Sequence, residues 1–375
     1  MSARPLTAVV LAAGEGTRMR SERPKPLHRL CGRPMVLHVL HAMGDLGLSR
    51  VAVVIGHGGD RVAKAVAEQL PDGLAVDFVE QRVQRGTGDA LAVAMTAFDA
   101  DPDEAGDVLV TPGDIPLLQG ATLATLVEAH QAADDAATLL TARLADPTGY
   151  GRVLRDRNGS VARVVEQADA TDGELAVDEV NTSVYAFRRS VVAPALRRLT
   201  PDNAQGEYYL TDVVAVLHDA GYGVGAVDVG DPVEVSGVND RVQLARVEAE
   251  LRRRVNRSWM ARGVTMVDPD HTYLDVTVEL AADVCVYPGT LLQGRTVVGE
   301  GAEIGPGTQL TDCRVGERAT VTASVGRAAE IGPDARVGPW SYLPPGSRVA
   351  AGLVTGPGFS ASVGTEEPGP SGARA

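Results

Sequence analysis

Short apolar runs alternate with amphipathic segments through the first part of the chain. Residues 6–13 (LTAVVLAA) are apolar at nearly every position, which predicts a strand buried on both faces, as in a helix-covered parallel sheet. Residues 34–47 repeat apolar side chains at helical spacing and end in glycine, which predicts a helix. Further strands are expected at 50–56, 74–81 and 107–118, and further helices at 60–70 and 87–98. This alternation predicts a doubly wound α/β domain over residues 1–238.

The pattern then changes twice. Residues 239–262 are charged around one apolar stripe of Val247, Leu251, Val255 and Trp259, which predicts a linking helix. Residues 263–355 instead carry aliphatic side chains every six residues, in one series of Val298, Ile304 and Leu310 and another of Ile331, Val337, Leu343 and Val349. A period of six predicts three short faces per turn, stacked as a left-handed parallel β-helix. Residues 356–375 are polar and rich in proline and glycine, which predicts a flexible tail.

Length, charge and cysteine content narrow the class of protein. A chain of 375 residues exceeds one ordinary core, so two domains are expected. The net charge of −14 argues against a nucleic-acid or anionic-membrane partner. The three cysteines (Cys31, Cys285 and Cys313) lack metal-ligand spacing and are interpreted as free thiols. There is no export signal and no apolar run of about 18 residues, which favours a cytoplasmic protein. Trimer packing is common among β-helices, so a homotrimer is the expected assembly.

The loop after the first predicted strand, LAAGEGTRM, carries the first candidate chemistry. Gly14 and Gly16 allow a tight turn that brings backbone amides against an anion. Arg18 and Lys25 follow within one short segment, where they can neutralise phosphates, and the loop lies at a strand's carboxyl end, where open α/β sheets bind ligands. The loop is neither a Walker motif nor a dinucleotide fingerprint, because Met19 stands where the latter needs glycine. We expect it to hold a nucleoside triphosphate.

A later strand ends in GDIPLL, which places Asp114 at the same edge of the sheet. A carboxylate there can hold Mg²⁺. The alternative for Asp114 alone is a helix N-cap. Together with the phosphate-binding loop, the metal interpretation is favoured.

Seven motifs occur in a characteristic order and spacing: LAAGEGTRM…PKPLH, GTGDA, GDIPLL, PTGYGRV, VNTSVYAF, NAQGEYYLTD and GVNDRVQLA. In these the chain resembles the N-acetylglucosamine-1-phosphate uridylyltransferases, and the bifunctional GlmU-type enzymes most closely. The resemblance covers nearly the whole chain, and NAQGEYYLTD is highly specific. It implies a Rossmann-like nucleotidyltransferase domain followed by a short β-helix. It also implies Mg²⁺-dependent transfer of UMP from UTP to N-acetylglucosamine 1-phosphate, giving UDP-N-acetylglucosamine and pyrophosphate.

The resemblance further implies a role for each site residue. Uracil would be seated by Leu11, Ala12, Ala13, Gly14, Gln81, Gly86 and Thr87. Arg18 and Lys25 would be catalytic, by binding the triphosphate and its developing charge. Mg²⁺ would be held by Asp114 and Asn239, and the amino sugar by Gly151, Glu166 and Asn181. Taken singly, Thr87 also fits a helix cap, Glu166 a surface carboxylate and Asn181 a strand-end turn.

Some positions depart from the family's pattern. Pro344 replaces a basic residue near the acetyl-coenzyme A site, and the expected lysine, histidine and tyrosine have no counterparts in GPGFSASVGTEEPGP. We therefore expect no acetyltransferase activity. In the first domain, Asp89 replaces the usual histidine of GTGHA, Pro112 precedes the GD pair, and Ala168 replaces a lysine close to the sugar phosphate.

Two other functions stay open on the sequence. One is a transferase of the same fold that uses another pair, such as dTTP with a different hexose 1-phosphate, for which the change at Ala168 leaves room. The other is a non-enzymatic sensor of sugar nucleotides with the β-helix as an assembly platform. Intact metal ligands argue against the sensor, and a panel of bases and sugars separates the two transferases.

Overall fold

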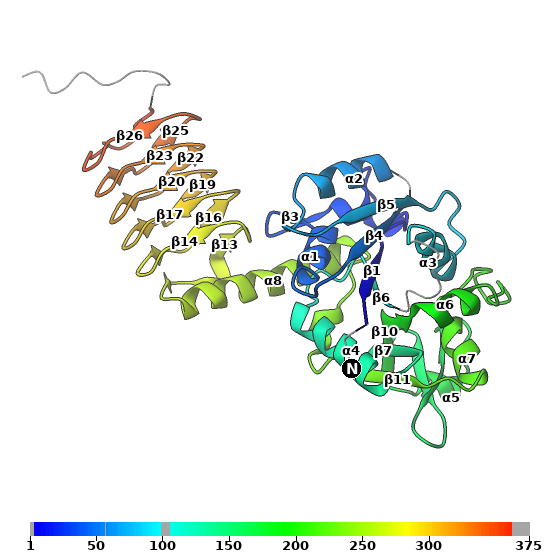
Figure 1. Cartoon of the computed structure of the whole chain (residues 1–375). Coiled ribbons are helices and arrows are strands. Elements are labelled where there is room, and N and C mark those ends of the chain that lie inside the picture. The colour runs from blue at the N-terminus through cyan, green and yellow to red at the C-terminus, as the bar shows by residue number, and fades with distance from the viewer. Residues whose placement is uncertain (1–3, 57, 99–105, 362–375) are drawn as a thin grey trace, which may run out of the picture. The chain divides into compact units, whose positions relative to one another are not determined.

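Three of the apolar segments pair side by side at the centre of a large sheet (Figure 1). They are β1 (Leu6–Leu11), β4 (Arg50–Ile55) and β6 (Asp107–Pro112). β1 lies between the other two and is parallel to both. In this computed structural model, which describes residues 4–56, 58–98 and 106–361, the sheet has nine strands, and its main path runs β11-β7-β10-β6-β1-β4-β5.

The outer strands complete this sheet on both sides of β1. Their bounds are β5 (Val76–Glu80), β7 (Ala137–Arg143), β8 (Arg152–Arg155), β9 (Val161–Val165), β10 (Glu179–Arg188) and β11 (Val224–Asp228). β10 is antiparallel to β6 and β7, and the β8–β9 hairpin pairs with β10 off the main path. Because consecutive parallel strands diverge to either side of β1, the loop after β1 emerges at the switch point of the sheet, where α/β folds bind ligands.

Helices cover both faces of the sheet, so the predicted doubly wound fold is confirmed. They are α1 (Met35–Ala42), α2 (Gly59–Ala67), α3 (Thr87–Met95), α4 (Gly120–Ala133), α5 (Asp172–Leu175), α6 (Arg189–Leu196) and α7 (Asp212–Asp219). One core packs α1, α2 and α4 on one face, and a second packs α3, α6 and α7 on the other. Successive β1 residues alternate between them, because Val9 joins one core while Ala8 and Val10 join the other.

The chain after α8 (Arg241–Ala261) coils into three parallel sheets of five strands each among the described residues, which confirms the β-helix (Figure 1). The first sheet holds β12 (Thr265–Met266), β15 (Cys285–Val286), β18 (Glu303–Ile304), β21 (Thr320–Val321) and β24 (Arg336–Val337). The second holds β13 (Thr272–Leu274), β16 (Thr290–Gln293), β19 (Gln309–Thr311), β22 (Val325–Arg327) and β25 (Tyr342–Leu343). The third holds β14 (Glu279–Leu280), β17 (Val297–Val298), β20 (Arg314–Val315), β23 (Glu330–Ile331) and β26 (Arg348–Val349).

Both aliphatic series of the β-helix face its interior, and the structure shows why they are out of phase. Every member of either series is at most 4% exposed. Between Leu310 and Ile331 the inward positions are Val315, Val321 and Gly326, so three of the four steps have five residues instead of six. Shorter corners therefore shift the register while each strand still stacks on the one below.

The limits of the two parts differ from the expected ones in three places. The compact units divide inside α8, one comprising residues 4–28 and 34–247 and the other 29–33 and 248–361. The pair β2 (Arg29–Leu30) and β3 (Arg33–Pro34) therefore begins in the second unit, where the N–H of Cys31 donates to Glu248 and its carbonyl accepts from Val276 at 3.0 Å. Coil pairing also continues past residue 355, because the N–H of Ala361 donates to the Tyr342 carbonyl. Of the predicted tail, 362–375 lies outside the described residues.

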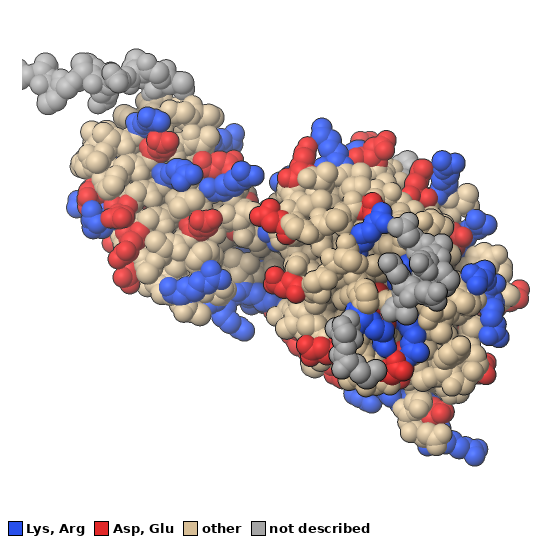
Figure 2. Space-filling view, viewed as in Figure 1, with Lys and Arg blue, Asp and Glu red and all other residues tan. Residues whose placement is uncertain are grey.

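Basic and acidic side chains are interspersed over the face shown in Figure 2. None of the helices in the described segments has the length and apolar character needed to cross a bilayer. All three cysteines are free thiols.

Candidate active site

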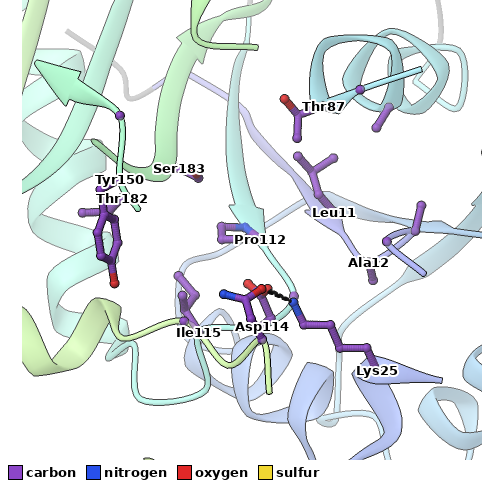
Figure 3. A pocket seen from close by; sticks show the side chains of 18 of the residues that line it. Leu11, Ala12, Lys25, Thr87, Pro112, Asp114, Ile115, Tyr150, Thr182 and Ser183 are labelled. Atoms are coloured by element: carbon purple, nitrogen blue, oxygen red, sulfur yellow. Dashed lines mark hydrogen bonds and ion pairs between the residues drawn. The ribbon is translucent and has the colours of Figure 1, made fainter. Parts of the chain in front are cut away.

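A cavity of about 540 Å³ opens in the first unit, where β1 and β6 end. Figure 3 shows Leu11 and Thr87 on one side of it, Tyr150 and Thr182 on the other, and Asp114 with Lys25 between them. All fourteen residues singled out in the sequence line this cavity: Leu11, Ala12, Ala13, Gly14, Arg18, Lys25, Gln81, Gly86, Thr87, Asp114, Gly151, Glu166, Asn181 and Asn239. The structure brings the set together, and the ligand assigned to each residue stays a prediction.

The glycines of the first loop leave room for Lys25 and for a ligand. Gly16 has a φ of 64°, and a Cβ there would lie 2.6 Å from the Cβ of Lys25. A Cβ on Gly14 would meet no protein atom within 4 Å, so this backbone faces open cavity. The loop continues as η1 (Thr17–Met19), whose last carbonyl accepts from Arg241 Nε at 3.1 Å. Gly16 therefore lets the loop pass close beside the lysine, as a side chain could not.

Lys25 lies at the centre of the site. It opens the short helix η2 (Lys25–Leu27) between two prolines, and its side chain is only 13% exposed. Its ammonium donates to the Asp114 carboxylate (Figure 3). It also donates to Asn239 Oδ1 at 2.8 Å, and Arg18 donates to the same Asn239 oxygen at 3.1 Å. The helix-cap alternative for Asp114 is wrong, because the next helix, α4, starts at Gly120.

The same two oxygens suit a divalent cation. The Asp114 and Asn239 oxygens converge on one point, where a positive charge is already accommodated as the Lys25 ammonium. No cluster of three or more acidic, histidine or cysteine ligands occurs among the described residues. Two protein oxygens still fit Mg²⁺, which is usually held by one or two carboxylates plus substrate phosphates and water. Asn239 is itself fixed before α8, because its N–H donates to Gln243 Oε1 at 2.7 Å.

The segment NAQGEYYLTD supports the start of α3 on the predicted uracil side. The N–H of Gly88 donates to the Tyr208 carbonyl at 2.8 Å, and the N–H of Tyr208 donates to the Arg85 carbonyl at 2.7 Å. The hydroxyl of Thr87 accepts from the N–H of Leu210 at 3.1 Å, so it braces this segment as well as starting the helix. Gly86 has a φ of 110°, and a Cβ there would lie 2.6 Å from the Tyr208 carbonyl oxygen. The backbone of this motif therefore packs closely against the start of α3.

Glu166 and Asn181 lie on the predicted sugar side of the cavity, and each already forms hydrogen bonds with other residues of the protein. Asn181 donates from Nδ2 to the Tyr185 hydroxyl at 2.7 Å and accepts from the N–H of Ser183, where the β10–β7 register shifts. The strand-end interpretation of Asn181 is therefore wrong, because the residue lies inside β10 at an irregularity of its pairing. Its amide keeps one further hydrogen. Glu166 is not a surface carboxylate: it accepts from Thr211 at 3.0 Å, and burial raises its pKa, with nearby Asp212 adding to the increase.

Some lining residues were not singled out in the sequence, although Tyr150 lies within the motif PTGYGRV. Gln84 donates to the Ala13 carbonyl and so ties the first loop to the segment before α3. Tyr150 lines the predicted sugar side, and burial raises its pKa. Polar and aromatic residues of this kind occur in ordinary loops, so only the fold reveals that they face the cavity.

Comparison with known proteins finds relatives over most of the chain. Residues 8–215 match the family model described as "MobA-like NTP transferase domain". The bifunctional protein GlmU of Mycolicibacterium vanbaalenii is 49% identical over 349 residues, which cover 93% of this chain and 70% of the relative. The GlmU proteins of Thermobifida fusca and Streptomyces coelicolor are 48% and 47% identical, over 88% and 92% of this chain and 68% and 71% of their own lengths.

The chain belongs to the GlmU family. It is accordingly an enzyme of the sugar-1-phosphate uridylyltransferase class, which transfers a nucleotidyl group to a sugar 1-phosphate. In this GlmU-family chain the matched domain contains residues 8–11 of β1, the loop after it and Asp114, and Asn239 follows outside the matched residues.

Substituting Gly16 by alanine should damage the site beyond its effect on stability. Gly47 is a matched control, because it also has a φ of 64°, but a Cβ added there would meet nothing within 4 Å, and it does not line the cavity. We expect each substitution to destabilise the fold by about 1–2 kcal/mol through left-handed strain. Only Gly16→Ala should lower kcat/KM, by roughly 10²-fold, because it displaces Lys25. Equal kcat/KM for the two variants would contradict this role of Gly16.

Glu166 should make stability depend on pH in a definite direction. A carboxyl whose folded pKa is raised stabilises the fold below its ordinary pKa of 4.5, and this contribution is lost as pH rises through the folded pKa. Glu166→Gln should therefore be more stable than the unsubstituted protein at pH 7, and the difference should shrink as pH falls toward 4.5. Thermal unfolding of both proteins across this range measures it. A gain that persists unchanged at low pH would count against burial as the cause.

Proposed function

We propose that this GlmU-family chain transfers UMP from UTP to N-acetylglucosamine 1-phosphate in a Mg²⁺-dependent reaction that yields UDP-N-acetylglucosamine and pyrophosphate. The observation that carries the proposal is the cluster of Arg18, Lys25, Asp114 and Asn239 between the two sides of one cavity. Cationic groups and two convergent oxygens meet there, where a nucleotide and a sugar phosphate have to be brought together.

The residues act by positioning and by charge. The phosphate of the acceptor sugar is already an anionic nucleophile, so the reaction requires no general base. Arg18 and Lys25 reduce the repulsion between the two polyanions and stabilise pyrophosphate as it leaves. To contact phosphate, the Lys25 ammonium exchanges its present acceptors, Asp114 and Asn239, for phosphate oxygens. Asp114 and Asn239 would hold Mg²⁺, which would supply further neutralisation of phosphate charge.

The structure gives little support to the alternative of another nucleotide and sugar 1-phosphate pair. Ala168, the departure that motivated it, is exposed and does not line the cavity. The proposal also excludes acetyl transfer, on the ground that Pro344 stands where the resemblance expects a basic residue.

A matched pair of lysines tests the catalytic proposal. The chain contains only two, Lys25 in the cavity and Lys64, which is exposed on α2. Lys25→Met should lower pyrophosphate release from Mg·UTP and N-acetylglucosamine 1-phosphate by about 10²- to 10³-fold, the cost of removing one charge-stabilising donor. Lys64→Met should leave the rate unchanged.

The same assay with dTTP, and with glucosamine and glucose 1-phosphates, should give much lower rates, and acetyl-coenzyme A should not be consumed with glucosamine 1-phosphate. Nucleotide binding without turnover for any pair would favour the sensor. Preferred turnover of another pair would replace the proposed substrates while keeping the mechanism.

We also propose that the chain assembles into a homotrimer through its β-helix. Its coils carry exposed apolar side chains, with Trp340 74% and Tyr342 45% exposed. Exposed aromatic side chains of this kind are available for contact with other copies of the chain. Sedimentation equilibrium should give three times the chain mass of 39.1 kDa. A monomer at micromolar concentration would contradict this assembly.

A further inference from the structure

The amide of Gln81 is fixed in one orientation at the cavity wall. Gln81 follows β5, its N–H donates to the Ile55 carbonyl at 2.9 Å, and the residue is only 5% exposed. Its Nε2 donates to the Gly86 carbonyl at 3.2 Å and to Asp89 Oδ2 at 2.9 Å. These two bonds use both amide hydrogens.

Turning the amide over would break both hydrogen bonds, because both partners are acceptors. A carbonyl and a carboxylate have no hydrogen to donate to a turned-over amide oxygen. In the part of the chain that the structure describes, no donor bonds Gln81 Oε1. Since Gln81 lines the cavity, the side-chain group that it offers a ligand is a hydrogen-bond acceptor.

Asp89 is positioned to fix the orientation of the Gln81 amide. It is the third residue of α3, its side chain is 16% exposed, and its other oxygen lies 3.5 Å from Arg85 Nε. The carboxylate therefore has one oxygen toward Arg85 and the other on Gln81. Asp89 does not itself line the cavity, so it acts on a ligand through Gln81.

We propose that Asp89 is a positioning residue that makes Gln81 select for bases carrying a ring N–H donor. Uracil presents such a donor at N3, whereas cytosine has an acceptor lone pair at N3 that faces the Gln81 oxygen unfavourably. The inference rests on the proposed use of a uridine nucleotide and deepens it, because it assigns the choice of base to a residue at which this chain departs from the family pattern. A site built around a fixed acceptor rejects the unmatched base by leaving polar groups unpaired.

A purely structural role for Asp89 predicts something different. An acidic residue in the first turn of a helix is stabilised by the helix dipole, and its removal then lowers stability without changing which base binds. Asp60 has that placement in the first turn of α2, away from the cavity, and serves as the control. Asp89→Asn separates charge from hydrogen bonding, because it removes the charge and keeps an acceptor oxygen.

The test is a double-mutant cycle on base discrimination. The ratio of Kd for Mg·CTP to Kd for Mg·UTP is measured by calorimetry for the unsubstituted protein, Asp89→Ala, Gln81→Met and the double variant. We expect Asp89→Ala to lower this ratio about tenfold, as for the loss of one charge-assisted hydrogen bond. In the Gln81→Met background the Asp89 substitution should change nothing further. Asp89→Asn should keep most of the ratio, and Asp60→Ala all of it.

Other outcomes overturn the inference in distinguishable ways. An unchanged ratio in Asp89→Ala, or an equal drop in both backgrounds, would show that Asp89 does not act through Gln81, while the proposed function would stand. Failure of the unsubstituted protein to bind Mg·UTP would remove the proposed function and this inference with it. If Asp89→Ala does not fold, Asp89→Ser gives the same test, because serine is favoured near helix starts and is too short to reach Gln81.

Discussion

The contact of the Lys25 ammonium with Asp114 and Asn239 is the interaction on which the site depends. It joins three segments that are far apart in the chain: the loop after β1, the turn after β6 and the residues before α8. Opposite charges held within a part-buried cavity attract more strongly than they would in water. The ligand-free site is thereby held together by the same groups that are proposed to meet phosphate and metal.

Much of the remaining site serves to keep these groups in place. Gly16 admits the lysine, Arg241 holds the end of the loop, and Gln243 fixes Asn239. On the predicted uracil side, packing of Tyr208 against Gly86 sets the start of α3. Backbone and side-chain contacts of this kind hold the charged groups precisely in place. Catalysis by positioning needs this precision, because a small displacement of a charged group lowers the rate.

The parts of the fold that could be predicted are those governed by regular burial. The β1 segment and the aliphatic series through Leu310 and Ile331 are visible because one period of apolar residues matches one structure. The five-residue steps around Gly326 were not predicted. In the sequence, a corner that is one residue shorter is visible only as an interruption of the six-residue period. The site residues could be collected from motifs, but the hydrogen bonds of Asn181 within β10 and of Gln81 with Asp89 depend on side-chain direction, which no linear pattern records.

One point between Asp114 and Asn239 is proposed to take the Lys25 ammonium in the free protein and the metal ion when nucleotide is bound. A crystal structure with Mn²⁺ and a non-hydrolysable UTP analogue tests it directly, through the anomalous signal of manganese. The account predicts an anomalous peak within ligand distance of both oxygens, with Lys25 moved onto phosphate. A peak elsewhere in the cavity, or Lys25 still bonded to Asp114 with nucleotide bound, would contradict it.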